Sequence, residues 1–287
     1  RASHLPTWVE EKTQGQIAAA DVVCLSLELI RTGGPAAVAE ALKNAPSGSM
    51  VIANAILQSD IEVVATAMVA AEAAGRKIIA RTAASFVCAR VGQRPPPLLS
   101  GSSLLNASGR GGLTIVGSHV PKTTAQLAVL KRTHDVTSVE LDVAALLDWT
   151  ERDGAIAQAT TTMNEALQAD RDVVLHTSRD LVRSSDDLTN LSISSNISQA
   201  LIEVVRSIEA PPRYLIAKGG ITSSDTATDG LGVIRARIKG QILPGVPVWE
   251  LGPETKFPGL SYVVFPGNVG DDNAVADAVT KFNSVSS

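Results

Sequence analysis

The sequence has few aromatic residues and no excess of basic charge. Aromatic residues make up 3% of the 287 residues, too few for the base-stacking surfaces of proteins that bind single-stranded nucleic acid. Lysine and arginine together number 25 against 29 aspartate and glutamate residues, which gives a formal net charge of -4. Nucleic-acid affinity comes largely from basic side chains that neutralise phosphates. We therefore expect no nucleic-acid partner.

Long apolar runs and export signals are also missing. No uncharged apolar stretch reaches the roughly 18 residues that a membrane helix needs, and no basic and apolar signal opens the chain. Cys24 and Cys88 lie in apolar runs and are predicted to be buried, reduced thiols, with a disulfide as the alternative. We expect a cytoplasmic protein without a membrane partner. The start at Arg1, without a methionine, indicates a fragment of a longer protein.

Short apolar runs alternate with amphipathic stretches in the first third of the chain. We expect strands at residues 22–27 and 51–55 and helices at 35–43 and 59–74, the second helix starting at Ser59 and Asp60. A further strand at 76–80 is predicted after the helix-ending Gly75. This order predicts a parallel sheet with helices on both faces. The fold class is α/β, with two layered domains, largely parallel sheets and an incomplete first domain.

Turn-forming residues interrupt this rhythm between residues 91 and 112. We expect a linker at residues 95–111, between domains at residues 1–94 and 112–287. The second domain resumes the alternation. Its strands are expected at 113–116, 138–143, 172–176, 214–217, 246–251 and 262–265, and its helices at 122–131, 155–169, 197–208, shortly after 222, and at 273–282.

A cluster of glycines and hydroxyls follows the strand at residues 214–217. Gly219 and Gly220 let the backbone turn closely around an oxyanion, and Lys218 adds a positive charge. Further donors to phosphate oxygens are the helix-start N–H groups and the hydroxyls of Thr222, Ser223 and Ser224. A tight turn with an N-cap is the alternative, but it explains only one glycine and one hydroxyl. The segment 219–225 is therefore predicted to grip phosphate.

Two other turns follow predicted strands, at Gly117–Ser118 and at Gly267. Parallel strands would place them on the same sheet edge as Gly219 and form a cleft. An N-capped helix and a plain turn are the respective alternatives. Neither a Walker A loop nor a Gly-x-Gly-x-x-Gly fingerprint is complete, so a P-loop NTPase and a nicotinamide dehydrogenase are less favoured. No metal site is assigned, because the histidines are scattered without carboxylate or thiol neighbours: His4, His119, His134 and His176.

Four runs, at residues 117–126, 217–225, 240–247 and 265–270, resemble the four-carbon acid sugar kinase family in sequence and order. The resemblance implies that residues 112–287 form the nucleotide-binding domain and residues 1–94 the end of the N-terminal, substrate-binding domain. Residues 81–87 also resemble versions of this kinase that are fused to hydroxyisobutyrate-dehydrogenase-like and class II aldolase-like domains. Such domains are therefore expected partners.

The family resemblance implies an ATP-dependent kinase, with Mg²⁺, that phosphorylates a terminal hydroxyl of a four-carbon sugar acid of the tetronate, threonate, erythronate or 3-dehydrotetronate type. The implied ATP-contacting residues are Ser118, Gly219, Gly220, Ile221, Thr222 and Gly267. Many family members carry an acidic residue in place of Ile221, and Asp225 is the nearest acidic residue here. No catalytic residue is assigned, because the N-terminal stretches that contact the sugar acid in the family have no counterpart. A non-catalytic nucleotide-binding module is the alternative.

Overall fold

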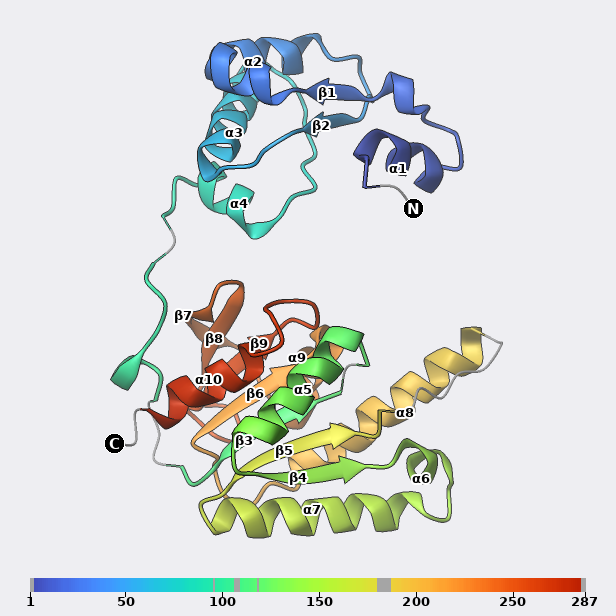
Figure 1. Cartoon of the computed structure of the whole chain (residues 1–287), viewed down its shortest axis with the longest axis vertical. Helices are drawn as coiled ribbons and strands as arrows, with labels where there is room; N and C mark the ends of the chain where they lie inside the picture. The colour runs from blue at the N-terminus through green and yellow to red at the C-terminus, as the bar shows by residue number, and fades with distance from the viewer. Residues whose placement is uncertain (1–2, 95, 106–108, 118, 180–186, 285–287) are drawn as a thin grey trace. The chain divides into compact units, whose positions relative to one another are not determined.

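The computed structural model describes residues 3–94, 96–105, 109–117, 119–179 and 187–284, with the side chains of residues 187–191 left undescribed. The chain divides into two compact units, Arg1–Pro95 and Pro96–Ser287 (Figure 1). Within the described residues, none of the helices combines the length and the apolar character that a membrane crossing requires.

The first unit is a small α/β structure around a two-stranded parallel sheet. Its elements are α1 (Leu5–Lys12), η1 (Ala19–Asp21), β1 (Val23–Leu25), η2 (Leu29–Gly33), α2 (Gly34–Asn44), β2 (Val51–Ala53), α3 (Gln58–Ala73) and α4 (Ala84–Arg90). β1 and β2 pair in parallel. The buried side chains of Leu25, Ile30, Val38 and Met68 form the core between the sheet and helices α2 and α3.

The start of α3 was expected at Ser59 and Asp60; it lies at Gln58 and depends on a buried carboxylate. Asp60 is 3% exposed and accepts bonds from the backbone N–H groups of Ile56 and Leu57 at 3.0 and 2.9 Å. Arg31 adds a two-pronged contact at 2.9 Å from Nε and from Nη2. The Arg31 guanidinium and these two N–H groups hold the pKa of Asp60 well below its usual range. Asp60 therefore caps α3 and joins it to the η2 turn.

Two expectations for the first unit are wrong. Residues 76–80 form no strand, and the Ile79 side chain is fully exposed. Cys24 is exposed and Cys88 is half-buried, and both are free thiols. Successive side chains of a strand point to opposite faces, so burial of Leu25 in the core turns Cys24 outward.

Among the described residues of the second unit, seven strands form one sheet in the order β4-β5-β3-β6-β9-β8-β7. The strands are β3 (Gly112–Val116), β4 (Val136–Leu141), β5 (Asp172–Thr177), β6 (Tyr214–Lys218), β7 (Ala236–Leu243), β8 (Val246–Leu251) and β9 (Ser261–Phe265). The neighbours from β4 to β9 are parallel. β8 and β7 continue the sheet in antiparallel fashion.

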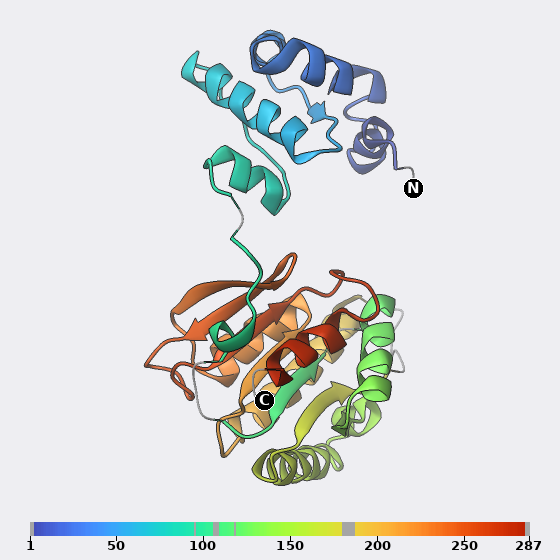
Figure 2. The same ribbon diagram turned by 60° about the vertical axis from the view of Figure 1, so that its left-hand side comes forward.

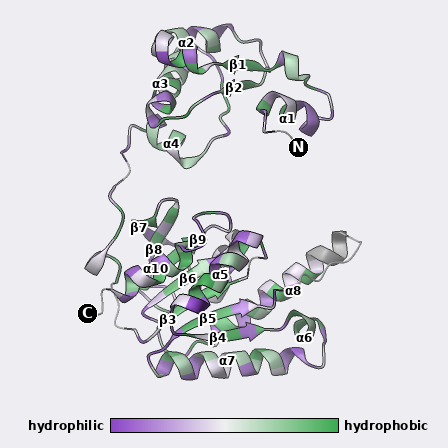
Figure 3. Cartoon of the chain, viewed as in Figure 1, coloured by the Kyte–Doolittle hydropathy of each residue, from purple (hydrophilic) through white to green (hydrophobic). Residues whose placement is uncertain are grey.

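Helices cover both faces of this sheet (Figures 1 and 2). One face carries α5 (Pro121–Thr133) and α10 (Ala274–Asn283). The other carries α6 (Val143–Leu147), α7 (Arg152–Gln168), α8 (Asp187–Arg206), α9 (Gly220–Asp225) and η4 (Thr226–Gly230). Because helices bury both faces, β3 and β6 are buried along their whole length, and the central strands are mostly hydrophobic (Figure 3). The predicted α/β class with a largely parallel sheet is confirmed.

The second unit also departs from the expected pattern. β7 and α6 were not predicted, α8 begins ten residues before the expected residue 197, and α9 begins at Gly220 rather than after Thr222. Part of the predicted linker belongs to this unit. Leu104 is fully buried in its core, and the Leu99 N–H donates to the Gln241 carbonyl at 2.7 Å. An η3 turn (Gly101–Ser103) lies between these two contacts.

Candidate functional site

Three neighbouring parallel strands end in the same register. Val116 of β3 pairs with Lys218 of β6, and Lys218 pairs in turn with Phe265 of β9. The turns that begin at Gly117, Gly219 and Pro266 therefore lie side by side at the carboxyl edge of the sheet. In the sheet, β4 and β5 lie on one side of β3, and β6, the next strand in the chain after β5, lies on the other side. Open α/β sheets bind ligands in the crevice at this kind of strand-order reversal.

Gly219 forms the central turn in a conformation that favours glycine. Its φ is 123° and its ψ is 145°, a region that side chains with a Cβ rarely adopt. Its N–H donates to the Phe265 carbonyl at 2.9 Å, which fixes the turn against β9. The space around Gly220 is open, because an added Cβ would meet nothing within 4 Å. The backbone N–H groups of Gly220 and Ile221 open the following helical turn and have no intrahelical acceptor. The turn therefore offers donors beside open space.

The hydroxyls of this turn differ in their roles. Ser223 is buried and bonds at 2.6 Å to the carbonyls of both Ala217 and Gly219, so its predicted role as a phosphate donor is wrong. The Tyr262 hydroxyl donates to the Ser223 carbonyl at 2.6 Å and braces the same turn. The Thr222 side chain is 9% exposed. Ser223 therefore stabilises the turn instead of facing a ligand.

Thr222 links the β6 turn to the β3 turn. A Cβ on Gly117 would lie 2.4 Å from Thr222 Oγ1, so the two turns approach each other closely and only glycine fits at residue 117. Ser118, a predicted ATP contact, lies outside the described residues. The next residue, His119, places Nε2 3.1 Å from the Ser178 carbonyl. Burial and the nearby Arg179 charge lower the pKa of His119, so a neutral ring donates this bond at neutral pH.

Lys218 lies beneath the β9–α10 loop. Its side chain is fully buried, and Nζ donates to the Pro266 carbonyl at 2.7 Å and to the Gly267 carbonyl at 3.3 Å. The ammonium also lies 4.2 Å from the centre of the Phe265 ring. Burial, with a smaller contribution from Lys122, lowers the pKa of Lys218 to about 8. Lys218 therefore holds the loop from below through two backbone carbonyls.

The first turns of α5 hold the same loop from the other side. Thr123 Oγ1 donates to the Gly267 carbonyl at 3.1 Å, and Lys122 Nζ donates to the Gly270 carbonyl at 3.0 Å. Gln126 is fully buried, and its Nε2 donates to the carbonyls of Val269 and Asp271 at 3.1 and 2.6 Å. Sequence reasoning did not assign Thr123 or Gln126 to the site. The polar Lys122–Thr123 pair, shortly after the Gly117 turn, is the sequence signal that could have pointed to this part of the site.

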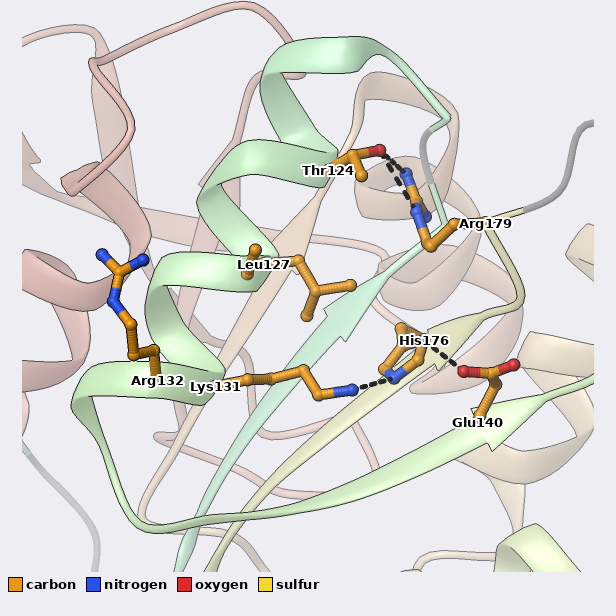
Figure 4. A pocket seen from close by; sticks show the side chains of 8 residues that line it. Thr124, Leu127, Lys131, Arg132, Glu140, His176 and Arg179 are labelled. Atoms are coloured by element: carbon orange, nitrogen blue, oxygen red, sulfur yellow. Dashed lines mark hydrogen bonds and ion pairs between the residues drawn. The ribbon is translucent and has the colours of Figure 1, made fainter.

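A cavity of about 450 Å³ lies on the β3–β5 side of the edge. We call it the α5–β5 cavity (Figure 4); its lining residues are Thr124, Leu127, Ala128, Lys131, Arg132, Glu140, His176 and Arg179. Arg179 Nη2 donates to Thr124 Oγ1 at 2.8 Å. Lys131 Nζ lies 3.4 Å from Nε2 of the buried His176. Burial lowers the pKa of His176, so its neutral ring accepts at Nε2 and donates from Nδ1 to the Thr177 carbonyl at 3.0 Å.

A second cavity, of about 380 Å³, lies on the β9–β7 side of α9. We call it the α9–β7 groove; its lining residues are Gly220, Ser223, Ser224, Ala227, Thr228, Val233, Ile234, Arg235, Ala236, Ile238, Trp249 and Val264. Gly220 and Ser223 belong to the turn described above, so the groove opens directly from it. Ile234 and Ile238 on its rim are 87% and 60% exposed.

Two protein-family models match the chain in series. Residues 113–275 match the nucleotide-binding C-terminal domain, and residues 1–90 match the sugar-binding N-terminal domain. The chain belongs to the four-carbon acid sugar kinase family. The three strand-end turns of this kinase-family protein all lie within the nucleotide-binding match. The roles of Ser118, Gly219, Gly220, Ile221, Thr222 and Gly267 in contacting ATP stay predictions.

Solved structures add a likeness of fold. A structure titled as a putative tRNA synthase from Salmonella typhimurium LT2 superposes with a TM-score of 0.60 at 16% identity, covering 90% of this chain and 59% of that one. A domain of unknown function from Bordetella bronchiseptica, with bound citrate, has a TM-score of 0.48 at 17% identity, covering 91% and 58%. The present chain thus spans about three fifths of the length of each of these two chains. The comparison with curated proteins returned no match.

Proposed function

We propose that this chain binds ATP and takes part in phosphorylating a terminal hydroxyl of a four-carbon sugar acid of the tetronate type. The observation that carries the proposal is the alignment of the turns at Gly117, Gly219 and Gly267 on one sheet edge. The matches to a sugar-binding and a nucleotide-binding family model support it. Fused dehydrogenase-like and aldolase-like partners and a cytoplasmic location belong to the same proposal.

The residues present at the edge suit a polyphosphate. The backbone N–H groups of Gly220 and Ile221 have no intrahelical acceptor, and the space beside the Gly220 Cα is open, as close approach of an anion to a glycine backbone requires. The ammonium groups of Lys218 and Lys122 are both bonded to carbonyls of the 266–270 loop, which places two positive charges beside the Gly267 turn. ATP supplies the phosphoryl group when bound. The turn amides orient its phosphates and stabilise the charge that develops during transfer.

Magnesium would enter with the nucleotide. Mg²⁺ is usually held by one or two carboxylates together with substrate phosphates. Within the described part of the chain, no group of three or more His, Cys, Asp or Glu side chains could hold a metal. Asp225, the acidic residue nearest the turn, accepts a bond from Ser198 at 2.5 Å. The proposal therefore assigns no protein ligand to Mg²⁺.

The first test is calorimetric titration with ADP and ATP in the presence of Mg²⁺. We expect binding to the wild-type chain and a loss of about tenfold or more in affinity for Gly219→Ala, because alanine strains a backbone at φ 123° that positions the donors. Gly259→Ala is the matched control, since Gly259 has a φ of 77° but lies in the β8–β9 connection. Absence of heat with either nucleotide up to millimolar concentration would sink the proposal.

Phosphoryl transfer separates the kinase from the alternative. A panel of tetronates, threonates and erythronates is incubated with ATP and Mg²⁺, and product is followed by phosphorus NMR. The kinase proposal expects a phosphorylated acid with at least one acceptor. A non-catalytic nucleotide-binding module predicts ADP binding with no product from any acceptor. A dehydrogenase domain would instead bind NAD in preference to ATP in a competition titration.

A further inference from the structure

We propose that the α9–β7 groove receives the purine base and ribose of the nucleotide. The inference rests on the proposed function, because it assumes that the glycine turns hold the phosphates. It adds which side of the edge the rest of the nucleotide occupies. The groove would also set the preference for a purine nucleotide over free polyphosphate.

The groove is continuous with the phosphate turn. Gly220 and the exposed Ser224 belong to both. On the opposite wall, Val264 of β9 lies one residue before the strand end at Phe265, where the Gly267 loop begins. A ligand whose phosphates lie between Gly219 and Gly267 can therefore extend directly into the groove. The α5–β5 cavity lies on the other side of β3.

The chemistry of the groove suits a flat heterocycle. Its walls carry Ala227, Val264 and the half-buried Trp249, and Ile234 and Ile238 rise at its rim. Exposed aliphatic side chains that gather around a concavity are typical of ligand-binding grooves. A Trp face contributes stacking with a base. The groove volume of about 380 Å³ falls within the range typical of small-molecule sites.

Polar groups at the groove can orient the ligand. Thr228 Oγ1 donates to the Ser224 carbonyl at 3.1 Å, and both residues line the wall next to Gly220. Arg235 is exposed, and its Nε lies 3.6 Å from a carboxylate oxygen of Glu254. Hydroxyls and a guanidinium can meet the ribose and the polar edge of a base. A mostly apolar site with a few such groups is the usual composition of a cofactor pocket.

The α5–β5 cavity has the opposite chemistry to the α9–β7 groove. The lining of the α5–β5 cavity includes Lys131, Arg132 and Arg179 against one carboxylate, that of Glu140 (Figure 4), and this excess of cations favours an anion over an uncharged base. A base in the α9–β7 groove also fixes the direction of the nucleotide. Its terminal phosphate points toward β3 and the Gly117 turn, away from β7.

The test compares ligands with and without a base. The exposed rim residues are changed singly, as Ile234→Asp and Ile238→Asp, which leaves the core unaltered. ADP and inorganic tripolyphosphate, both with Mg²⁺, are titrated by calorimetry. We expect ADP affinity to fall about tenfold or more, because the apolar contact is lost, while tripolyphosphate affinity changes less than twofold. Trp149→Asp is the matched control, since Trp149 is 88% exposed and lies outside the groove.

Tryptophan fluorescence gives a second measurement without a groove substitution. With Trp8→Phe and Trp149→Phe, Trp249 is the remaining tryptophan of the sequence. ADP should quench its emission and tripolyphosphate should not. Unchanged ADP affinity in both aspartate variants, with no quenching, would place the base elsewhere while leaving the proposed kinase function standing. Failure of the wild-type chain to bind either ligand would overturn both proposals.

Discussion

At the scale of single residues, the polar groups of this edge divide into those that face outward and those that brace the backbone. The sequence identified the glycines and the hydroxyl-rich segment, because glycine spacing after a strand carries its own signal. It could not tell that Ser223 turns inward or that Lys218 bonds to the carbonyls of Pro266 and Gly267. Lys218 finds its partners 48 and 49 residues away in the chain, and the Ser223 carbonyl is held by Tyr262, 39 residues away.

The buried Lys218 predicts a pH dependence of nucleotide binding. Its pKa of about 8 means that the ammonium loses its charge as the pH rises from 7 to 9. An anionic ligand loses this attraction, so we expect ADP affinity to fall over that interval in wild type and to stay nearly flat in Lys218→Met. Calorimetric titrations at each pH measure it. Lys281→Met, which removes a similar bond to the Ile242 carbonyl at 2.7 Å, should keep the wild-type profile.

Folding stability should change in the opposite direction. The folded pKa of Lys218 lies below its ordinary value of 10.5, so between about pH 8 and 10.5 the unfolded chain binds more protons than the folded chain. The contribution of this lysine to stability therefore rises with pH across that window. A fall in ADP affinity that accompanies a fall in the unfolding midpoint would point to unfolding and contradict the prediction.

At the scale of secondary-structure elements, alternating strands and helices predicted most of the second unit. The failures have physical causes. Residues 76–80 have strand-like composition, but a strand also requires a partner with which to pair. β7 includes Gly240 and two register irregularities, which hide its alternation from the sequence. Gln126 and the Val269 carbonyl are 143 residues apart, so no local pattern could have shown that α5 holds the β9–α10 loop.

The contact between α5 and this loop can be tested by removing one hydroxyl. Thr123→Val keeps the shape of a fully buried side chain and removes its bond to the Gly267 carbonyl. We expect a loss of about 1 kcal/mol in unfolding free energy and a several-fold weaker affinity for ADP, because the loop is held less firmly. Denaturant unfolding and calorimetry measure the two effects.

Thr133→Val is the control on the same helix, since its hydroxyl bonds to the Val129 carbonyl at 2.8 Å and to His134 Nδ1 at 2.9 Å, and neither partner belongs to the β9–α10 loop. A similar loss of ADP affinity in both variants would mean that the loop contact has no special part in binding.

At the scale of the whole molecule, the two units carry the two family matches. Sequence composition indicated a break near residues 95–111, and the domain boundaries at 94 and 111 stay predictions. The segment that follows Pro96 is bonded to the second unit through Leu99 and buried in it at Leu104. Two leucines in a proline- and glycine-rich stretch gave no periodic signal, so the sequence could not reveal this contact.

Truncation tests whether residues 96–111 are a linker or a part of the second unit. A chain of residues 96–287 should bind ADP with an affinity within about twofold of the whole chain. A chain of residues 112–287 loses the buried Leu104 and the Leu99 bond, and burial of one leucine contributes about 1.5–3 kcal/mol. We expect its melting temperature to be about 5 °C or more lower by calorimetry. Equal melting temperatures for the two truncations would show that residues 96–111 contribute nothing to the fold.

The close approach of Gly117 to Thr222 has an evolutionary consequence. A side chain at residue 117 would collide with the threonine hydroxyl, so residue 117 cannot gain a side chain unless residue 222 becomes smaller or shifts. Relatives that carry alanine at the first position should carry a smaller residue at the second, and those that keep threonine should keep glycine. Two turns on separate strands would then covary as a single unit in the history of the family.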